Sequence, residues 1–285
     1  MARINTPPTK TQDSTPGFEY LMAPPPESIK KNYKPSEKLK NKVAIITGGD
    51  SGIGRAIALH YVLEKCKVVI VYNNEHIDAE ITQKLITENH GECLLIAGDI
   101  GDHDFCKQVV ELTLKKFYQI DIIVNNAGEL KPQENFEDIS PQQLERTFRT
   151  NVFGMFYLVS AALPYLQEKS CIINTASSSA YKGQKELVDY SASKGAVVAF
   201  TRSLSQNLMD RKIRVNAVAP GFTWTPLIAT NYSVKAIETF SLNTPMGRPG
   251  QPSEIAPCYV FLASEDASYM TGQMMHPNGG SIINA

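Results

Sequence analysis

The stretch Thr47-Gly48-Gly49-Asp50-Ser51-Gly52-Ile53-Gly54 decides the fold of this chain. A short apolar run over 43–47 precedes it, and a helical pattern over 54–64 follows it. Glycines let the backbone turn tightly and approach a ligand closely, while a helix N-terminus offers unpaired N–H groups to an anion. Glycines alone would mark no more than a tight turn. Between a strand and a helix they predict a loop that binds the pyrophosphate of a dinucleotide.

Short apolar runs alternate with helical patterns along the chain after residue 42. Such runs are typical of strands buried on both faces of a parallel sheet. Another helix begins at Ser140, where Pro141 and Gln143 complete the pattern of a capping box. We therefore predict one doubly wound, Rossmann-like α/β domain over 42–285, with helices on both faces of the sheet. The predicted strands are 43–47, 68–72, 93–97, 122–125, 171–175 and 214–219, and the predicted helices include 54–64, 77–89 and 103–116.

The N-terminal residues 1–41 form a separate segment in this prediction, because they are rich in proline and lack a periodic apolar pattern. Such a segment cannot bury enough surface to offset its chain entropy by itself. Two readings stay open. The segment is a disordered tail, or it is an arm that packs along its own body or a neighbouring subunit. In the second reading its anchors are Phe18, Tyr20, Leu21 and Tyr33.

Charge and composition argue against several classes of protein. Lys and Arg number 28 against 29 Asp and Glu, which gives no electrostatic footprint for nucleic acid or an anionic membrane. No apolar run approaches the ~18 residues of a membrane span, and no stretch resembles a signal peptide. The five histidines show no metal-ligand spacing, and the five cysteines contain no Cys-x-x-Cys pair. We expect a reduced, cytoplasmic protein without a metal site.

The stretch Tyr190-Ser191-Ala192-Ser193-Lys194 carries the predicted chemistry. Residues four apart share one face of a helix, so the Lys194 ammonium can approach the Tyr190 phenol. A phenol has a reference pKa of about 10, and a nearby cation favours the phenolate, which brings proton transfer closer to neutral pH. Ser177 follows the fifth predicted strand and can hold a substrate oxygen beside Tyr190. Such a Tyr and Lys are commonplace alone and become informative only together with the glycine loop.

The pattern T-G-x-x-x-G-I-G over 47–54 resembles the glycine signature of the short-chain dehydrogenase/reductase family, and the resemblance extends over 42–285. Further matches are Asp99-Ile100, Asn125-Asn126-Ala127-Gly128, Asn151 and Pro220-Gly221 with Thr225. The chain further resembles a bacterial subgroup of uncharacterised oxidoreductases in its N-terminal segment, its glycine loop and its glycines over 272–280. The family spaces Tyr and Lys more widely in its enoyl reductases, which disfavours that activity here.

The resemblance implies an NAD(P)-dependent oxidoreductase that moves a hydride between nicotinamide and a small carbonyl or alcohol (CH–OH) substrate. It implies a homotetramer and a catalytic set of Asn151, Ser177, Tyr190 and Lys194. A cofactor-binding sensor without turnover, or a scaffold acting through the N-terminal segment, is the alternative. The implied cofactor-binding residues are Gly48, Asp50, Ser51, Gly52, Ile53, Gly54, Tyr72, Asn73, Asp99, Ile100, Asn125, Ala127, Gly128, Tyr190, Lys194, Pro220, Gly221, Thr223 and Thr225.

The choice between NAD and NADP depends on the end of the second strand, where an acid usually binds the ribose 2′-hydroxyl of NAD. Here that position is Tyr72, and neither an acid nor an Arg stands beside it. Ser51 occupies a place where NADP-using relatives carry a basic residue, and Glu75 reaches the ribose only if its loop folds back. The missing basic clamp favours NAD.

The loops 129–133, 180–187 and 224–245, with Trp224 among them, predict a half-apolar substrate pocket, open to sugars, ketones, aldehydes and acyl thioesters.

Overall fold

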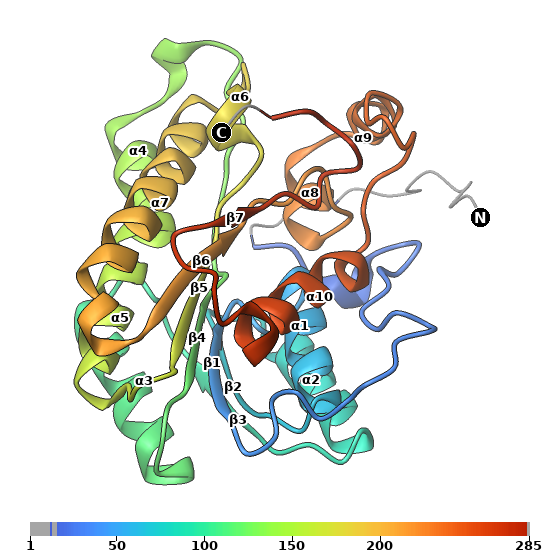
Figure 1. The fold of residues 1–285 in the computed structure, drawn as a ribbon. Helices are drawn as coiled ribbons and strands as arrows, with labels where there is room; N and C mark the ends of the chain where they lie inside the picture. Colours follow the sequence, from blue (N-terminus) through green and yellow to red (C-terminus); the bar gives the residue numbers. More distant parts are fainter. Residues whose placement is uncertain (1–11, 13–15, 284–285) are drawn as a thin grey trace.

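Seven parallel strands form one sheet in the order β3-β2-β1-β4-β5-β6-β7 (Figure 1). Figure 1 shows a computed structural model, which describes residue 12 and residues 16–283. The strand order reverses between β1 and β4, so the connections that leave their carboxyl ends run in opposite directions. The crevice between these connections is where doubly wound folds bind ligands. The strands are β1 Val43–Thr47, β2 Lys67–Tyr72, β3 Cys93–Ala97, β4 Ile122–Asn125, β5 Cys171–Thr175, β6 Arg214–Val218 and β7 Met274–Met275.

Helices cover both faces of the sheet, as the sequence predicts. In Figure 1, α3, α4, α5 and α7 lie on one side, α1, α2 and α10 lie on the other, and α8 and α9 stand at the carboxyl edge. The helices are α1 Gly52–Leu63, α2 His76–Glu88, α3 His103–Phe117, α4 Pro141–Phe148, α5 Gly154–Ala162, α6 Ser179–Lys182, α7 Val188–Asn207, α8 Pro226–Asn231, α9 Val234–Leu242 and α10 Pro252–Ala263.

The two layers of core explain why the strands read as continuous apolar runs. Successive side chains of a strand point to opposite faces. In β1, Ile45 packs in the cluster that contains residues of α3 and α5, whereas Ile46 packs in the cluster with α1 and α10. Both side chains are fully buried. A sheet covered on both sides therefore needs an apolar residue at nearly every strand position.

The predicted element boundaries hold to within two residues, and two details differ. The two-residue strand β7 is too short to produce a sequence pattern. The capping box at Ser140 is half formed: the Ser140 hydroxyl accepts a hydrogen bond from the Gln143 N–H at 3.1 Å. The Gln143 side chain donates instead to the carbonyl oxygen of Lys131 at 3.0 Å and to Asp189 Oδ2 at 3.1 Å. Tertiary partners thus outcompete the local cap.

Residues 16–41 lie against the body of the protein, beside α1 and α10 (Figure 1). The buried anchors are Glu19, Met22 and Leu39, whereas two of the expected anchors, Tyr20 and Leu21, are 44% and 52% exposed. For the described residues, packing along its own body is therefore the reading that holds. Residues 1–11 and 13–15 of the predicted segment lie outside the described residues. Across the described chain, no helix is long and apolar enough to cross a membrane.

Candidate active site

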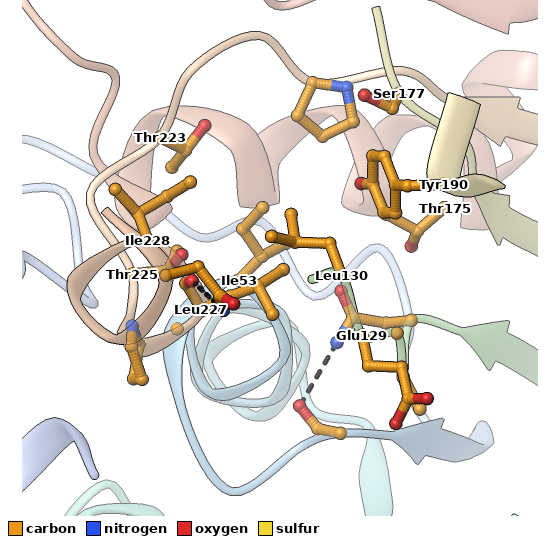
Figure 2. Close-up of a pocket in the computed structure, with 18 of the residues that line it drawn as sticks. Ile53, Glu129, Leu130, Thr175, Ser177, Tyr190, Thr223, Thr225, Leu227 and Ile228 are labelled. Atoms are coloured by element: carbon orange, nitrogen blue, oxygen red, sulfur yellow. Dashed lines mark hydrogen bonds between the residues drawn. The ribbon is translucent and has the colours of Figure 1, made fainter. Parts of the chain in front are cut away.

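A cleft of about 790 Å³ opens at the carboxyl ends of β1, β4, β5 and β6. Figure 2 shows Ser177 and Tyr190 on one wall, Thr223, Thr225 and Ile228 on the other, and Ile53 and Leu130 between them. The sequence-predicted residues that line the cleft are Gly48, Asp50, Ser51, Gly52, Ile53, Tyr72, Asn73, Asp99, Ile100, Ala127, Gly128, Ser177, Tyr190, Lys194, Pro220, Gly221, Thr223 and Thr225.

The glycine loop turns because two of its glycines adopt conformations that other residues rarely adopt. Gly48 and Gly52 have φ angles of 61° and 52°. Gly54, which the sequence places among the cofactor contacts, does not line the cleft. A Cβ atom at Gly54 would lie 1.8 Å from the carbonyl oxygen of Gly48, so this glycine is needed for close packing of α1 against the loop.

Asn125 is a second predicted contact that the structure places elsewhere. Its side chain is buried beneath the cleft and donates to Asn174 Oδ1 at 2.8 Å, because neighbouring strand ends pair there. Its neighbour Asn126 lines the cleft instead. The Asn126 amide donates to the carbonyl oxygens of Thr47 and Gly48 at 3.0 and 3.1 Å. Asn126 therefore ties the end of β4 to the glycine loop.

Tyr190 and Lys194 lie one turn apart on α7, and Ser177 faces Tyr190 from the end of β5 (Figure 2). The Lys194 Nζ atom donates to the carbonyl oxygen of Thr175 at 2.8 Å and lies 5.7 Å from the centroid of the Tyr190 ring. A Cβ at Gly128 would lie 3.4 Å from the same Nζ atom, so the glycine leaves room for the ammonium. The predicted Ser, Tyr and Lys thus meet on one wall of the cleft.

The electrostatics of this wall differ from the sequence-based expectation that Lys194 lowers the pKa of Tyr190. Burial raises the pKa of Tyr190 to about 12, and the hydrogen bond from Ser177 offsets only part of the effect. Burial also lowers the pKa of Lys194 to about 8. For the pKa values of both groups, the loss of hydration on burial therefore outweighs the influence of one group on the other. Tyr190 is a neutral phenol at pH 7.

Asn151 lies behind the wall and does not line the cleft. It sits in a π-helical segment, Arg149–Phe153, between α4 and α5. Its amide accepts from the Glu129 N–H at 2.8 Å and donates to the Glu129 carbonyl oxygen at 2.9 Å and to Ser193 Oγ at 3.0 Å. With its side chain fully engaged, Asn151 holds the β4 loop against α7 rather than facing the cleft.

A charged cluster that sequence reasoning missed lines the cleft beside Asp99. Arg146 of α4 donates to Asp99 Oδ2 at 2.5 Å and to Glu129 Oε2 at 3.2 Å. Partial burial of Asp99 raises the pKa of its carboxyl, but the hydrogen bonds from Arg146 and Gly101 and the charge of Arg146 together outweigh burial, so the pKa of Asp99 is lowered. No short spacing links these three residues, because they come from the ends of β3, β4 and from α4.

At the end of β2, two carboxylates line the cleft beside Tyr72 and Asn73. Glu75 is 6% exposed, and its carboxylate accepts a hydrogen bond from the N–H of the preceding Asn74 at 2.9 Å. Burial, together with the charge of Glu75, raises the pKa of Asp50 to about 7. Pro16 and Gly17 of the N-terminal segment, which the sequence did not indicate, also line the cleft. The cleft is thus acidic at this end.

The expected substrate loops reach the cleft only in part. Lys182 and Leu187 line it, as does Leu227. Trp224 does not: it is 4% exposed and belongs to an apolar cluster with Met22 and with Leu187 and Ile228, which line the cleft. The N-terminal segment contributes to this burial through Met22 and the Pro24 carbonyl oxygen, and the sequence left the course of that segment open.

Comparison with known proteins now assigns the family. Residues 48–281 match the family model described as enoyl-(acyl carrier protein) reductase. The uncharacterized oxidoreductase YhxC of Bacillus subtilis is 56% identical over 277 residues, which cover 97% of this chain and 96% of that protein. The glucose and ribitol dehydrogenase of Daucus carota is 48% identical and covers 97% of both chains. NADPH-dependent aldehyde reductase 1 of Arabidopsis thaliana is 46% identical over 96% of this chain and 98% of its own.

Solved structures agree. A short-chain dehydrogenase/reductase from Brucella melitensis, titled a glucose/ribitol dehydrogenase, superposes with a TM-score of 0.79 at 33% identity, covering 87% of this chain and 99% of that one. A 3-ketoacyl-(acyl-carrier-protein) reductase from the same organism, complexed with NADH, gives 0.78 at 35% identity, over 85% and 98% of the chains. The chain therefore belongs to the short-chain dehydrogenase/reductase family of oxidoreductases.

Proposed function

We propose that this chain reduces a small carbonyl compound with a nicotinamide cofactor, and that Tyr190 donates the proton. The observation that carries the proposal is the meeting of Ser177, Tyr190 and Lys194 on one wall of the cleft. Tyr190 is protonated at pH 7, which is the form that a proton donor needs, and the nearby Lys194 ammonium offsets part of the weakening of this acid by burial. The same residues would run in reverse during alcohol oxidation, with Tyr190 accepting the proton.

The cleft fits a dinucleotide at its glycine loop. Gly48 and Gly52 bring bare backbone to the N-terminus of α1, where an anionic pyrophosphate is favoured. Tyr72 and Asn73 would contact the adenosine, and Pro220 and Thr225 the nicotinamide end. The bound cofactor would supply the hydride.

The protein side of the chemistry follows from positions in the wall. The Ser177 and Tyr190 hydroxyls point into the cleft and can bind one oxygen of the substrate together (Figure 2). Tyr190 then moves its proton to that oxygen. Lys194, anchored on the Thr175 carbonyl oxygen, positions its ammonium beside the phenol and favours the phenolate that this step leaves.

We propose NAD(H) as the preferred cofactor. A 2′-phosphate of NADP would add negative charge at the end of β2, where Glu75 already places a carboxylate and Asp50, with its pKa raised to about 7, is ionised in part at neutral pH. No Arg or Lys lines this end of the cleft among the residues that the structure describes there. The carboxylates can instead accept hydrogen bonds from ribose hydroxyls.

The substrate that we propose is a small carbonyl compound that carries hydroxyl groups. The apolar floor of the pocket includes Leu130 and Leu227, while its rim offers the amides and hydroxyls of Gln184, Asn231 and Tyr232. The Gln184 amide donates to the Tyr232 hydroxyl at 3.4 Å, and the Asn231 amide donates to the Leu227 carbonyl oxygen at 2.9 Å. The amide oxygens and the Tyr232 O–H remain for the hydroxyl groups of a substrate. Relatives named glucose and ribitol dehydrogenase and aldehyde reductase support this class.

A homotetramer is the assembly that we propose from the family resemblance. The outer face of α5 and the turn before it expose Phe153 (38%) and Phe156 (50%), and the Phe156 ring packs against Phe200 at 4.2 Å between centroids. Such aromatic surface supports an interface. Sedimentation velocity at micromolar concentration should give a tetramer, and a stable monomer contradicts this assembly.

Tyr190→Phe tests the activity. Turnover of NADH with small hydroxyaldehydes and ketones should fall by about 10²–10⁴-fold, because proton donation is lost. The dissociation constant of NADH, followed by nicotinamide fluorescence, should stay within about twofold, since no cofactor phosphate depends on the phenol. Retained turnover in this variant rejects Tyr190 as the donor.

A further inference from the structure

The N-terminal residues 16–27, which we name the strap, are fixed at the start of α1 by a buried charge cluster. The Glu19 side chain is 5% exposed, accepts a hydrogen bond from the Gly52 N–H at 2.5 Å, and forms an ion pair with Arg55. The backbone N–H groups of Glu19 and Tyr20 donate to the Asp78 carboxylate at 2.7 and 3.1 Å. A carboxylate at a helix N-terminus is favoured by the helix dipole. Loss of one charge would leave the others buried and uncompensated.

The strap also contacts α8 on the opposite wall of the cleft. Gly17 passes so close that a Cβ atom there would lie 2.8 Å from the carbonyl oxygen of Pro226. Further along, Met22 is 6% exposed and packs in one apolar cluster with Trp224 and Ile228. The Trp224 indole N–H donates to the carbonyl oxygen of Pro24 at 2.9 Å. These contacts are apolar or neutral, in contrast to the charged cluster at α1.

A third attachment fixes the far end of the strap to α10. The Glu27 N–H donates to Gln251 Oε1 at 2.8 Å, and the Ser253 N–H donates to the Glu27 carbonyl oxygen at 2.9 Å. The Ser253 hydroxyl donates to Glu27 Oε1 at 2.6 Å. The strap is therefore attached to α1 through Glu19 and to α10 through Glu27, while Gly17 before the first attachment and Met22 between the two lie on the α8 side of the cleft.

We propose that the strap is part of the binding site and holds α8 closed over the cleft, so that release of the cofactor requires α8 to detach from it. The inference rests on the proposed function. α1 supplies Ile53 to one wall and α8 supplies Leu227 and Ile228 to the other, and Pro16 and Gly17 of the strap line the space between them. Since the contacts with α8 lack charge, α8 separates while the strap stays on α1.

The sole tryptophan of the chain, Trp224, reports this contact directly. Met22→Ala shortens a buried side chain that shares an apolar cluster with Trp224 and does not line the cleft. We expect the Trp224 emission to shift to the red and its quenching by acrylamide to increase, because the indole gains exposure. In stopped-flow displacement, NADH should leave about fivefold faster, because the variant removes apolar contact between the strap and the α8 side of the cleft.

Leu21→Ala is the matched control, since Leu21 neighbours Met22 and is 52% exposed. It should change neither emission nor release. Trp224→Phe provides a second variant that removes the N–H donor to Pro24, and it should also accelerate NADH release. Unchanged release in both Met22→Ala and Trp224→Phe overturns the proposal. The emission and quenching measurements need no cofactor, so a protein that fails to bind NADH contradicts the proposed function while the strap contact is still tested.

Discussion

Two parts of the same cleft are built in contrasting ways. The wall that carries Ser177, Tyr190 and Lys194 comes from β5 and α7, which lie close together along the chain. The acidic end near β2 contains Asp50 and Glu75, and at the start of α1 the strap is attached through Glu19, which reaches the Gly52 N–H across 33 residues. The wall places ionisable groups in an apolar setting without a partner of opposite charge, while the strap buries charges that neutralise one another in part. The catalytic wall thus holds its ionisable groups in an environment that lowers the stability of the fold, and the strap beside it adds rigidity.

The largest effect on stability that this contrast predicts is a pH dependence caused by Lys194. Burial lowers its pKa to about 8 in the folded protein, from the ordinary lysine value of 10.5. Between these values the unfolded chain binds a proton that the folded protein does not, so stability rises with pH in this window. Below pH 8 Lys194 is charged in both the folded and the unfolded state, so the folded protein bears the full free-energy cost of burying that charge. Relative to Lys194→Met, the wild type should gain about 3 kcal/mol of unfolding free energy between pH 8 and 10.5.

Urea unfolding of both proteins at several pH values measures this difference. Tyr190 acts in the opposite direction only above pH 10, because burial raises its pKa to about 12, so the unfolded chain ionises first and folding loses stability. The window from pH 8 to 10 is therefore the cleanest. A stability difference between the two proteins that does not vary with pH means that Lys194 is not held in an unfavourable setting.

Substitution of the neighbours Asn125 and Asn126 should have smaller effects, on stability for the first and on NADH binding for the second. Asn125→Ala removes the donor to Asn174 Oδ1, and Asn174 in turn donates to Thr201 at 2.9 Å, so a buried polar chain is broken. We expect a loss of about 1–3 kcal/mol in unfolding free energy with the NADH dissociation constant unchanged. Asn126→Ala should instead weaken NADH binding, because the Thr47 and Gly48 carbonyl oxygens lose the amide that holds the glycine loop. Weaker NADH binding in Asn125→Ala contradicts this division of roles.

The same pair shows what the sequence could and could not predict. Features of regular secondary structure were predicted well. The strand boundaries, the turn at Gly48 and the position of Tyr190 and Lys194 on one face of a helix follow from local backbone geometry. Asn125 and Asn151 belong to family motifs, yet whether each side chain faces the cleft or the core depends on its neighbours across the sheet. The contacts of Glu19 and Trp224 could not be predicted, because no periodicity relates a proline-rich segment to the helices that it crosses.

The smallest predicted effect concerns cofactor choice at the acidic end. Glu75→Gln removes one of the two carboxylates near the end of β2 and keeps the shape of the side chain. With less repulsion toward a 2′-phosphate, NADPH should bind about tenfold more tightly, which corresponds to about 1.4 kcal/mol, while NADH should change little. Fluorescence titration with both cofactors measures the ratio. Glu88→Gln, at the distant and exposed end of α2, changes the net charge equally and should leave that ratio unaltered. An equal response to both substitutions would place the cofactor preference in the overall charge of the protein rather than in the carboxylates that line the cleft.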